Sequence, residues 1–143
     1  MVSVVSLLGS LRAQGRIWVL TKDISTTVAA GARSLIQHID RIGPFNKLYI
    51  TGVALVSEAN TNWRIKFYKR DTGIVGAYNT DTYIGDVEIA SLSATAGAYY
   101  EGSVECSIPY WDQDKTNEIH FIAENIGQVT SKVFVNIIFT DAE

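Results

Sequence analysis

The sequence predicts an all-β protein, an eight-stranded antiparallel jelly-roll sandwich over residues 16–143 preceded by an N-terminal arm over residues 1–15. Short segments rich in β-branched and aromatic residues recur along the chain, and turn residues separate them. No long helical period occurs outside the arm. The 143 residues suit one domain, and two four-stranded sheets suit the strand count. A seven-stranded immunoglobulin-like sandwich is the alternative, although a single cysteine cannot supply the disulfide usual in that fold.

The first half of the chain contains four predicted strands, at residues 17–24, 34–42, 47–56 and 63–69. The polar stretch 25–31 predicts a loop after the first strand. The second segment forms a strand or a helical turn, which Gly43-Pro44 ends. The third is almost continuously apolar, which predicts a central strand buried on both faces. The fourth alternates, so that Trp63, Ile65 and Phe67 are directed to the core.

The second half contains the other four predicted strands, at residues 83–89, 99–108, 118–124 and 132–140. Alternation places Tyr83 on one face with Val87 and Ile89. It also places Cys106 on the apolar face of its strand, where a buried thiol is inert. Residues 91–97 are expected to form a loop. Pro109 is expected to end a strand and open a second loop at 110–117, and residues 125–128 suit a hairpin turn.

Charge is distributed unevenly along the chain. Residues 1–70 hold ten basic and three acidic side chains, a net of +7, whereas residues 71–143 hold two basic and twelve acidic ones, a net of −10. The charges are spread among apolar residues and do not form blocks. Two interpretations remain open: the halves neutralise each other on folding, or they form complementary faces on neighbouring subunits.

The N-terminal arm is apolar and short. It is expected to contact a partner through Val2, Val4, Val5, Leu7, Leu8 and Leu11. A short amphipathic helix and an extended segment both fit this pattern. Packing against the arm's own domain is the alternative to packing against a partner. The apolar run is too short to span a bilayer, and the features of a secretory signal are missing, so no membrane partner is expected.

No catalytic signature is present, so the sequence predicts a protein without enzymatic activity, cofactor or bound metal. Asp112 and Asp114 begin an alternating run of oxygen side chains, but the glycine and glutamate of a calcium-binding EF-hand loop are missing. His120 is expected to be an exposed strand residue near two carboxylates. His38 has no nucleophile that would complete a triad.

A candidate ligand-binding loop is formed by Tyr110, Trp111, Asp112 and Asp114. Aromatic rings stack on sugars, and carboxylates accept hydrogen bonds from hydroxyl groups, which indicates a carbohydrate-binding site. Folding of Trp111 back onto the end of the sandwich is the alternative. A nucleic-acid partner is not expected, because alternation separates Arg64 and Lys66 from the neighbouring aromatic residues and the protein is acidic overall.

Residues 108–125 (IPYWDQDKTNEIHFIAEN), followed by the β-rich residues 132–140, resemble small jelly-roll virion proteins of tailed phages, which include capsid decoration proteins and fibre-type modules. The resemblance implies a structural virion protein that is assembled in the host cytoplasm. It also implies a homo-oligomer, with a trimer favoured, and binding of a capsid or other virion protein through the arm and the sheet surfaces. The alternative function is a carbohydrate-binding or receptor-binding module.

Overall fold

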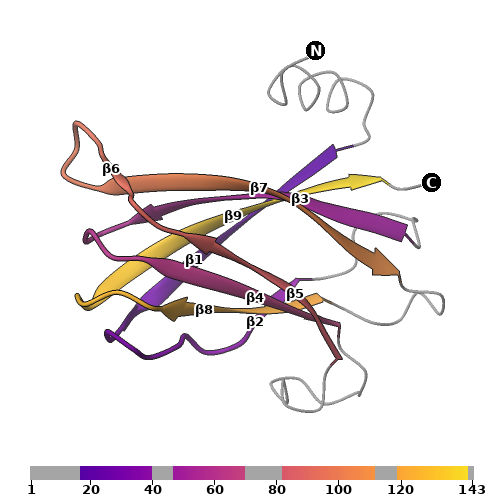
Figure 1. Cartoon of the computed structure of the whole chain (residues 1–143), viewed down its shortest axis with the longest axis horizontal. Coiled ribbons are helices and arrows are strands. Elements are labelled where there is room, and N and C mark those ends of the chain that lie inside the picture. Colours follow the sequence, from indigo (N-terminus) through magenta and orange to yellow (C-terminus); the bar gives the residue numbers. More distant parts are fainter. Residues whose placement is uncertain (1–16, 40–46, 70–81, 112–118, 142–143) are drawn as a thin grey trace.

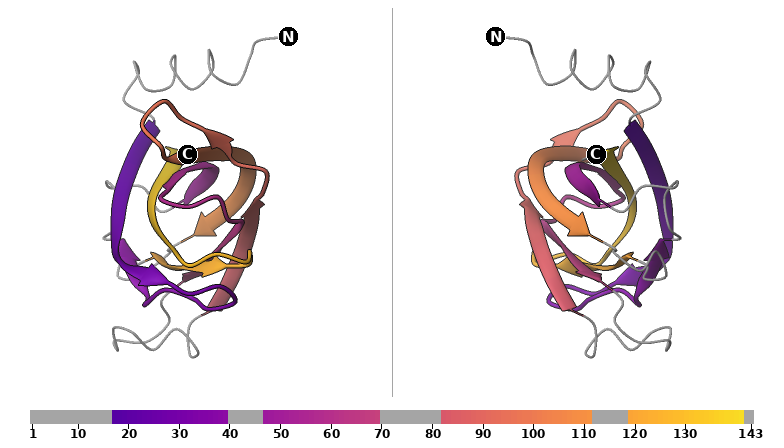
Figure 2. Two further views of the ribbon diagram at one scale, coloured as in Figure 1. Left: turned by 90° about the vertical axis from the view of Figure 1, so that its left-hand side faces the viewer. Right: turned by 90° about the vertical axis from the view of Figure 1, so that its right-hand side faces the viewer.

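The computed structural model describes residues 17–39, 47–69, 82–111 and 119–141, which form two antiparallel sheets packed face to face (Figures 1 and 2). The five-stranded sheet has the order β1 (Ile17–Val28), β9 (Ser131–Asp141), β3 (Lys47–Ser57), β7 (Tyr100–Trp111), β6 (Ser93–Ala94). The four-stranded sheet has the order β2 (Gln37–Ile39), β8 (Ile119–Asn125), β4 (Trp63–Lys69), β5 (Thr82–Ile89).

This strand order confirms the predicted jelly roll. The chain passes between the sheets from β1 to β2, from β3 to β4 and from β8 to β9, and sequence-distant strands such as β1 and β9 become neighbours. The described residues contain nine strands, one more than predicted. The additional strand, β6, consists of two residues that pair with Tyr100 and Glu101 at the start of β7.

Side-chain alternation builds the core as predicted for β4, where Trp63, Ile65 and Phe67 are fully buried. The same period in β9 buries alternate residues from Val133 to Phe139. These side chains meet in one cluster between the two sheets.

Several predicted strand boundaries are wrong, and each error has a local cause. β1 continues through the predicted loop to Val28, which is buried and pairs with Ser131 after an irregularity in register. β2 begins at Gln37, three residues later than predicted, and residues 40–42 of the predicted strand lie outside the described residues. β7 continues past Pro109 to Trp111. β6 pairs only with Tyr100 and Glu101, so the edge of β7 on that side has no strand partner at Pro109, and a residue without an N–H group is tolerated there.

The predicted burial of β3 on both faces is also wrong. Tyr49 is 40% exposed, and Ala54 and Val56 are half-buried. In a sandwich a central strand contacts the other sheet on one side only, so a continuous apolar run does not require two buried faces.

Gly85 reverses the predicted face of Tyr83. The residue has a φ of +152°, and the register between β4 and β5 shifts beside it. A Cβ atom there would lie 3.2 Å from side-chain atoms of Ile108. The resulting bulge leaves Tyr83 51% exposed, although Val87 and Ile89 are buried as predicted.

Three of the connections between the sheets meet around the fully buried side chain of Asn125, the last residue of β8. Its Nδ2 donates hydrogen bonds to the carbonyl oxygens of Val28 (3.0 Å) and Val129 (2.7 Å). Its Oδ1 accepts hydrogen bonds from the hydroxyl of Thr61 (2.7 Å) and the N–H of Gly127 (3.1 Å). One amide therefore joins three crossings of the chain. Residues 126–130 link strands of different sheets, so the predicted hairpin turn is wrong.

A second buried polar group lies at the same end of the sandwich. The Nε1–H of Trp63 donates to the Ser57 hydroxyl (3.1 Å), which lies 3.1 Å from the Ser131 hydroxyl. The N–H of Ala59 donates to the Ser131 oxygen (2.9 Å). These bonds join the start of β4 to the end of β3 and the start of β9.

We predict that Asn125→Ala lowers the free energy of unfolding by about 3 kcal/mol, because it leaves several buried donors and acceptors without partners. Gln128→Ala, at an exposed position three residues away, should change stability by less than about 0.5 kcal/mol. Urea denaturation of the two variants measures both values. Equal midpoints would show that the amide does not hold the three connections together.

Candidate interaction surface

The side of the five-stranded sheet that faces away from the core, which we call the outer face, carries a ridge of apolar side chains. Phe134 and Ile138 point outward because they alternate with the buried residues of β9. Val19 is the cross-strand partner of Ile138, and Val56 is the partner of Phe134. Val19 and Phe134 are 42% and 39% exposed, respectively, which is high for large apolar residues on adjacent strands.

Exposed acidic side chains surround the ridge. They are Asp23, Glu58, Glu101 and Glu105. Asp23 lies directly opposite Phe134, and Glu101 lies directly opposite Val56. Lys132 is an exposed base at the same end of β9. Asn136 lies between Phe134 and Ile138 on the same side of β9 and accepts a hydrogen bond from the hydroxyl of Thr21 (2.7 Å), so it interrupts the ridge. The face is therefore apolar near both ends of β9 and acidic at its borders.

The outer face is hollowed in two places. A groove of about 390 Å³ lies between Phe134 and Tyr99, with Val56 and Val133 as apolar lining. We call it the Phe134 groove. Its polar groups come from Asp23, Glu58 and Lys132. A neighbouring hollow of about 580 Å³ shares Val56 and is lined mainly by small or polar residues, namely Ala54, Ala90, Ser91, Ser93, Ser103 and Asn136.

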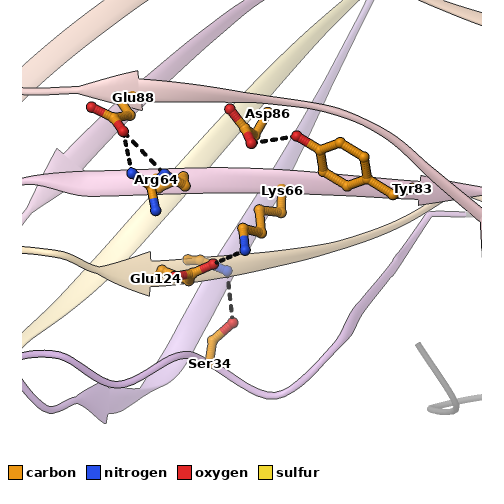
Figure 3. Close-up of polar contacts among 8 residues, drawn as sticks. Ser34, Arg64, Lys66, Tyr83, Asp86, Glu88 and Glu124 are labelled. Carbon is orange, nitrogen blue, oxygen red and sulfur yellow. Dashed lines mark hydrogen bonds and ion pairs between the residues drawn. The ribbon is translucent and has the colours of Figure 1, made fainter. Parts of the chain in front are cut away.

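The exposed face of the four-stranded sheet has a different character, because its charges pair within the sheet (Figure 3). Arg64 on β4 forms an ion pair with Glu88 on β5, and Lys66 reaches Glu124 on β8 at 2.8 Å. The hydrogen bond to Glu88 raises the pKa of Arg64, and the hydrogen bond to Glu124 raises the pKa of Lys66. Both pairs join the basic first half of the chain to its acidic second half, so the predicted neutralisation on folding is confirmed here.

Tyr83 extends this polar face. Its hydroxyl donates a hydrogen bond to Asp86, three residues further along β5 (Figure 3). That bond, followed by burial, raises the pKa of Tyr83 to about 12. The phenol stays protonated at neutral pH, so it contributes a donor and no charge.

The predicted site residues are located only in part. The arm residues Val2 to Leu11, and Asp112 and Asp114, lie outside the described residues. Tyr110 and Trp111 belong to the end of β7, with their backbones paired to Leu48 and Lys47, so the predicted loop does not include them. The Phe134 groove was not predicted. The outward alternation of Phe134 along residues 132–140 is the signal that could have revealed it.

His120 is fully buried, which contradicts the expectation that it is exposed. It lies on β8 between β2 and β4, opposite His38 and Tyr68. The run from Ile119 to Ala123 is buried at every position, so a central strand with both sides covered replaces the expected exposed strand.

Cys106 lies on the inward face of β7 as predicted, and it is half-buried. Its thiol donates to the carbonyl oxygen of Ile50 (3.3 Å). Burial raises the pKa of Cys106 to about 11. In the described ranges, His, Cys, Asp and Glu side chains nowhere gather in threes at a spacing that would hold a metal ion. The described residues also include no helix of the length and hydropathy needed to cross a membrane.

No family model and no curated protein matches this chain. Among solved structures, the chain is similar to the Yersinia pseudotuberculosis-derived mitogen, with 12% identity and a TM-score of 0.45 over 89% of this chain and 86% of that one. The PRD1 vertex protein P5 has 14% identity and a TM-score of 0.44 over 90% and 73% of the two chains. A family 6 carbohydrate-binding module has 16% identity and a TM-score of 0.40 over 91% of both chains. All three TM-scores are below 0.5, so neither a family nor a function follows from them.

We predict that Cys106 reacts slowly with iodoacetamide in the folded protein. A pKa of about 11, against 9.0 for a free cysteine, leaves about 100-fold less thiolate at pH 8. Labelling rates followed by mass spectrometry should therefore be at least about 100-fold lower in buffer than in about 8 M urea, which unfolds the protein and exposes the thiol. Similar rates in the two solvents would contradict the inward placement.

We also predict that two phenylalanines of β9 differ sharply in their effect on stability. Phe139→Ala should lower the free energy of unfolding by about 3–5 kcal/mol, because it empties a fully buried site. Phe134→Ala should lower it by less than about 1 kcal/mol, because this ring faces outward. Urea denaturation gives both values. A large loss for Phe134→Ala would show that the ring supports the fold and is not available to a partner.

Proposed function

We propose that this protein is a structural protein of a viral particle, a capsid decoration protein that stabilises the shell by binding neighbouring subunits through its arm and its outer face. The observation that carries the proposal is the outer face itself. Its apolar ridge of Val19, Phe134 and their strand neighbours is exposed across adjacent strands of a rigid sandwich. Exposed apolar side chains gathered on one face are typical of sites where proteins bind each other.

The shape and chemistry of the face suit a protein partner. Binding would bury apolar area worth about 25 cal/mol per Å², reduced by the entropy of ordering the arm. Acidic residues around an apolar centre resemble the polar rim and apolar core of protein interfaces. A partner that presents basic residues around an apolar patch would be complementary.

The proposal includes the remaining features predicted from the sequence. The protein acts without enzymatic activity or cofactor, associates with itself, with a trimer favoured, and is located in the virion. Half-buried Cys106 and fully buried His120 support a non-enzymatic role, because neither lines either of the two hollows of the outer face. Neither nucleic acid nor membrane is a partner in this proposal.

A carbohydrate-binding or receptor-binding module is the second candidate. The observation that favours it is the pair of exposed aromatic residues, Tyr99 and Phe134, beside two carboxylates in the Phe134 groove. Aromatic rings beside hydrogen-bonding groups also suit a sugar. A glycan panel separates the two functions, since only this second candidate requires a glycan to bind the full-length chain.

Deleting residues 2–11 should abolish binding to particles that lack this protein, while the circular dichroism spectrum of a folded β-protein is retained. The arm supplies apolar contacts with a neighbour, whereas the sandwich has its own core. Co-sedimentation with the particles measures binding. The control is Leu35→Ser, which removes a side chain 76% exposed outside the outer face and should leave binding unchanged. Undiminished binding by the deletion variant would refute the role of the arm.

A further inference from the structure

We infer that the outer face receives residues 1–16 of a second copy of this chain, and that an arginine of that segment enters the Phe134 groove. The inference deepens the proposed structural role and rests on it. It names both the surface that receives the arm and the molecule that supplies the arm.

The groove has the chemistry that a guanidinium group requires. Phe134 and Tyr99 provide aromatic faces, and Asp23 and Glu58 provide carboxylates in the same hollow. Arginine stacks on aromatic rings and forms paired hydrogen bonds with carboxylates, which a lysine ammonium cannot reproduce. Lys132 also borders the groove, so its local charge is that of two acids against one base.

The N-terminal segment is complementary to this face in both respects. Residues 1–16 contain Arg12 and Arg16 and no acidic residue, and the first acid of the chain is Asp23. The apolar residues Val2 to Leu11 precede the arginines directly. An apolar and basic segment therefore matches an apolar and acidic face, and one chain carries both.

The place where the segment joins the sandwich favours a second copy. Ile17 pairs with Thr140, whereas the groove residue Asp23 lies six residues further along β1, about 20 Å away, so Arg16 of the same chain cannot reach the groove. In the single chain, Val19, Tyr49 and Phe134 each remain about two-fifths exposed. An extended segment of 16 residues spans up to about 50 Å. The outer face from Thr140 to Phe134 measures about 20 Å, so the segment is long enough to cover the face of a neighbour.

The edges of the sheets favour contact through a face. On β1, Lys22 lies on the inward side opposite buried Val135, which discourages another strand from pairing there. On β5, the Gly85 bulge interrupts the edge, and β2 is only three residues long. On β7, Pro109 has no N–H group to donate to an added strand. Association by extending a sheet is therefore disfavoured in each described sheet.

A charge-swap experiment on the full-length chain tests the inference. One variant reverses the segment (Arg12→Glu with Arg16→Glu), and another reverses the groove (Asp23→Lys with Glu58→Lys). Native mass spectrometry and sedimentation equilibrium should shift each variant from a multiple of 15.7 kDa to 15.7 kDa. Mixing the two variants should restore association, because each then offers the other a complementary contact. Lys132→Glu should strengthen association of the otherwise unchanged chain.

Each other outcome overturns the inference. A wild-type chain that stays at 15.7 kDa at all concentrations, or a mixture that stays at this mass, would mean that the segment binds its own domain or nothing. Loss of association on reversing the groove but not the segment would indicate another occupant. Circular dichroism checks that every variant is folded. The test needs no viral particles, so its failure is distinct from failure of the proposed function, which is judged by particle binding.

Discussion

The buried amide of Asn125 is the contact on which the arrangement of the two sheets depends. Its two N–H groups and its carbonyl oxygen make four hydrogen bonds, and these reach the end of β1, the connection from β3 to β4, and the connection from β8 to β9. Its own backbone also bonds to Gly31 and Ala32, on the way from β1 to β2. Aspartate could not supply the donors, and leucine could supply neither donors nor acceptors. A fully satisfied polar group of this kind specifies one topology among the many that a sandwich core would accept.

This arrangement separates the two ends of the molecule. The Asn125 contacts and the contacts between Ser57, Trp63 and Ser131 lie at the end of the sandwich where β1, β3 and β8 end and where β4 and β9 begin. The strand ends Ile17 and Trp111 lie at the other end, beside Thr140 and Lys47 respectively. The arm and the candidate loop after Trp111 are thus joined to the sandwich far from the polar contacts that hold it together.

Features that depend on neighbours in sequence were predictable, and features that depend on neighbours in space were not. The alternation of β4 was predicted residue for residue, because an alternating strand over a core has a period of two whatever its partners are. The exposure of Tyr49 was missed because an apolar run does not reveal how many layers cover it. His120 alternates with the core residues Phe121 and Ala123, so it lies on the other side of β8, and the sequence does not reveal that this side is also covered. The contacts of Asn125 join residues up to 97 positions apart. The outward residues of β9 could be read from alternation, but their importance became visible only when β1 and β3 were placed beside them.

The uneven charge of the sequence has a different meaning on each face of the sandwich. On the four-stranded sheet, Arg64 and Lys66 form ion pairs with Glu88 and Glu124 from the second half of the chain, so these opposite charges neutralise each other within the fold. On the five-stranded sheet, Asp23, Glu58 and Glu101 are exposed around apolar residues, and the one exposed base described among them is Lys132. Among the described residues, exposed acidic side chains therefore lie on the same face as the uncovered apolar ones. Since the described sheet edges resist pairing, the proposed contact with a second copy is made through the face of the sheet. Such a contact can close into a finite assembly, whereas pairing of strand edges tends to continue without limit.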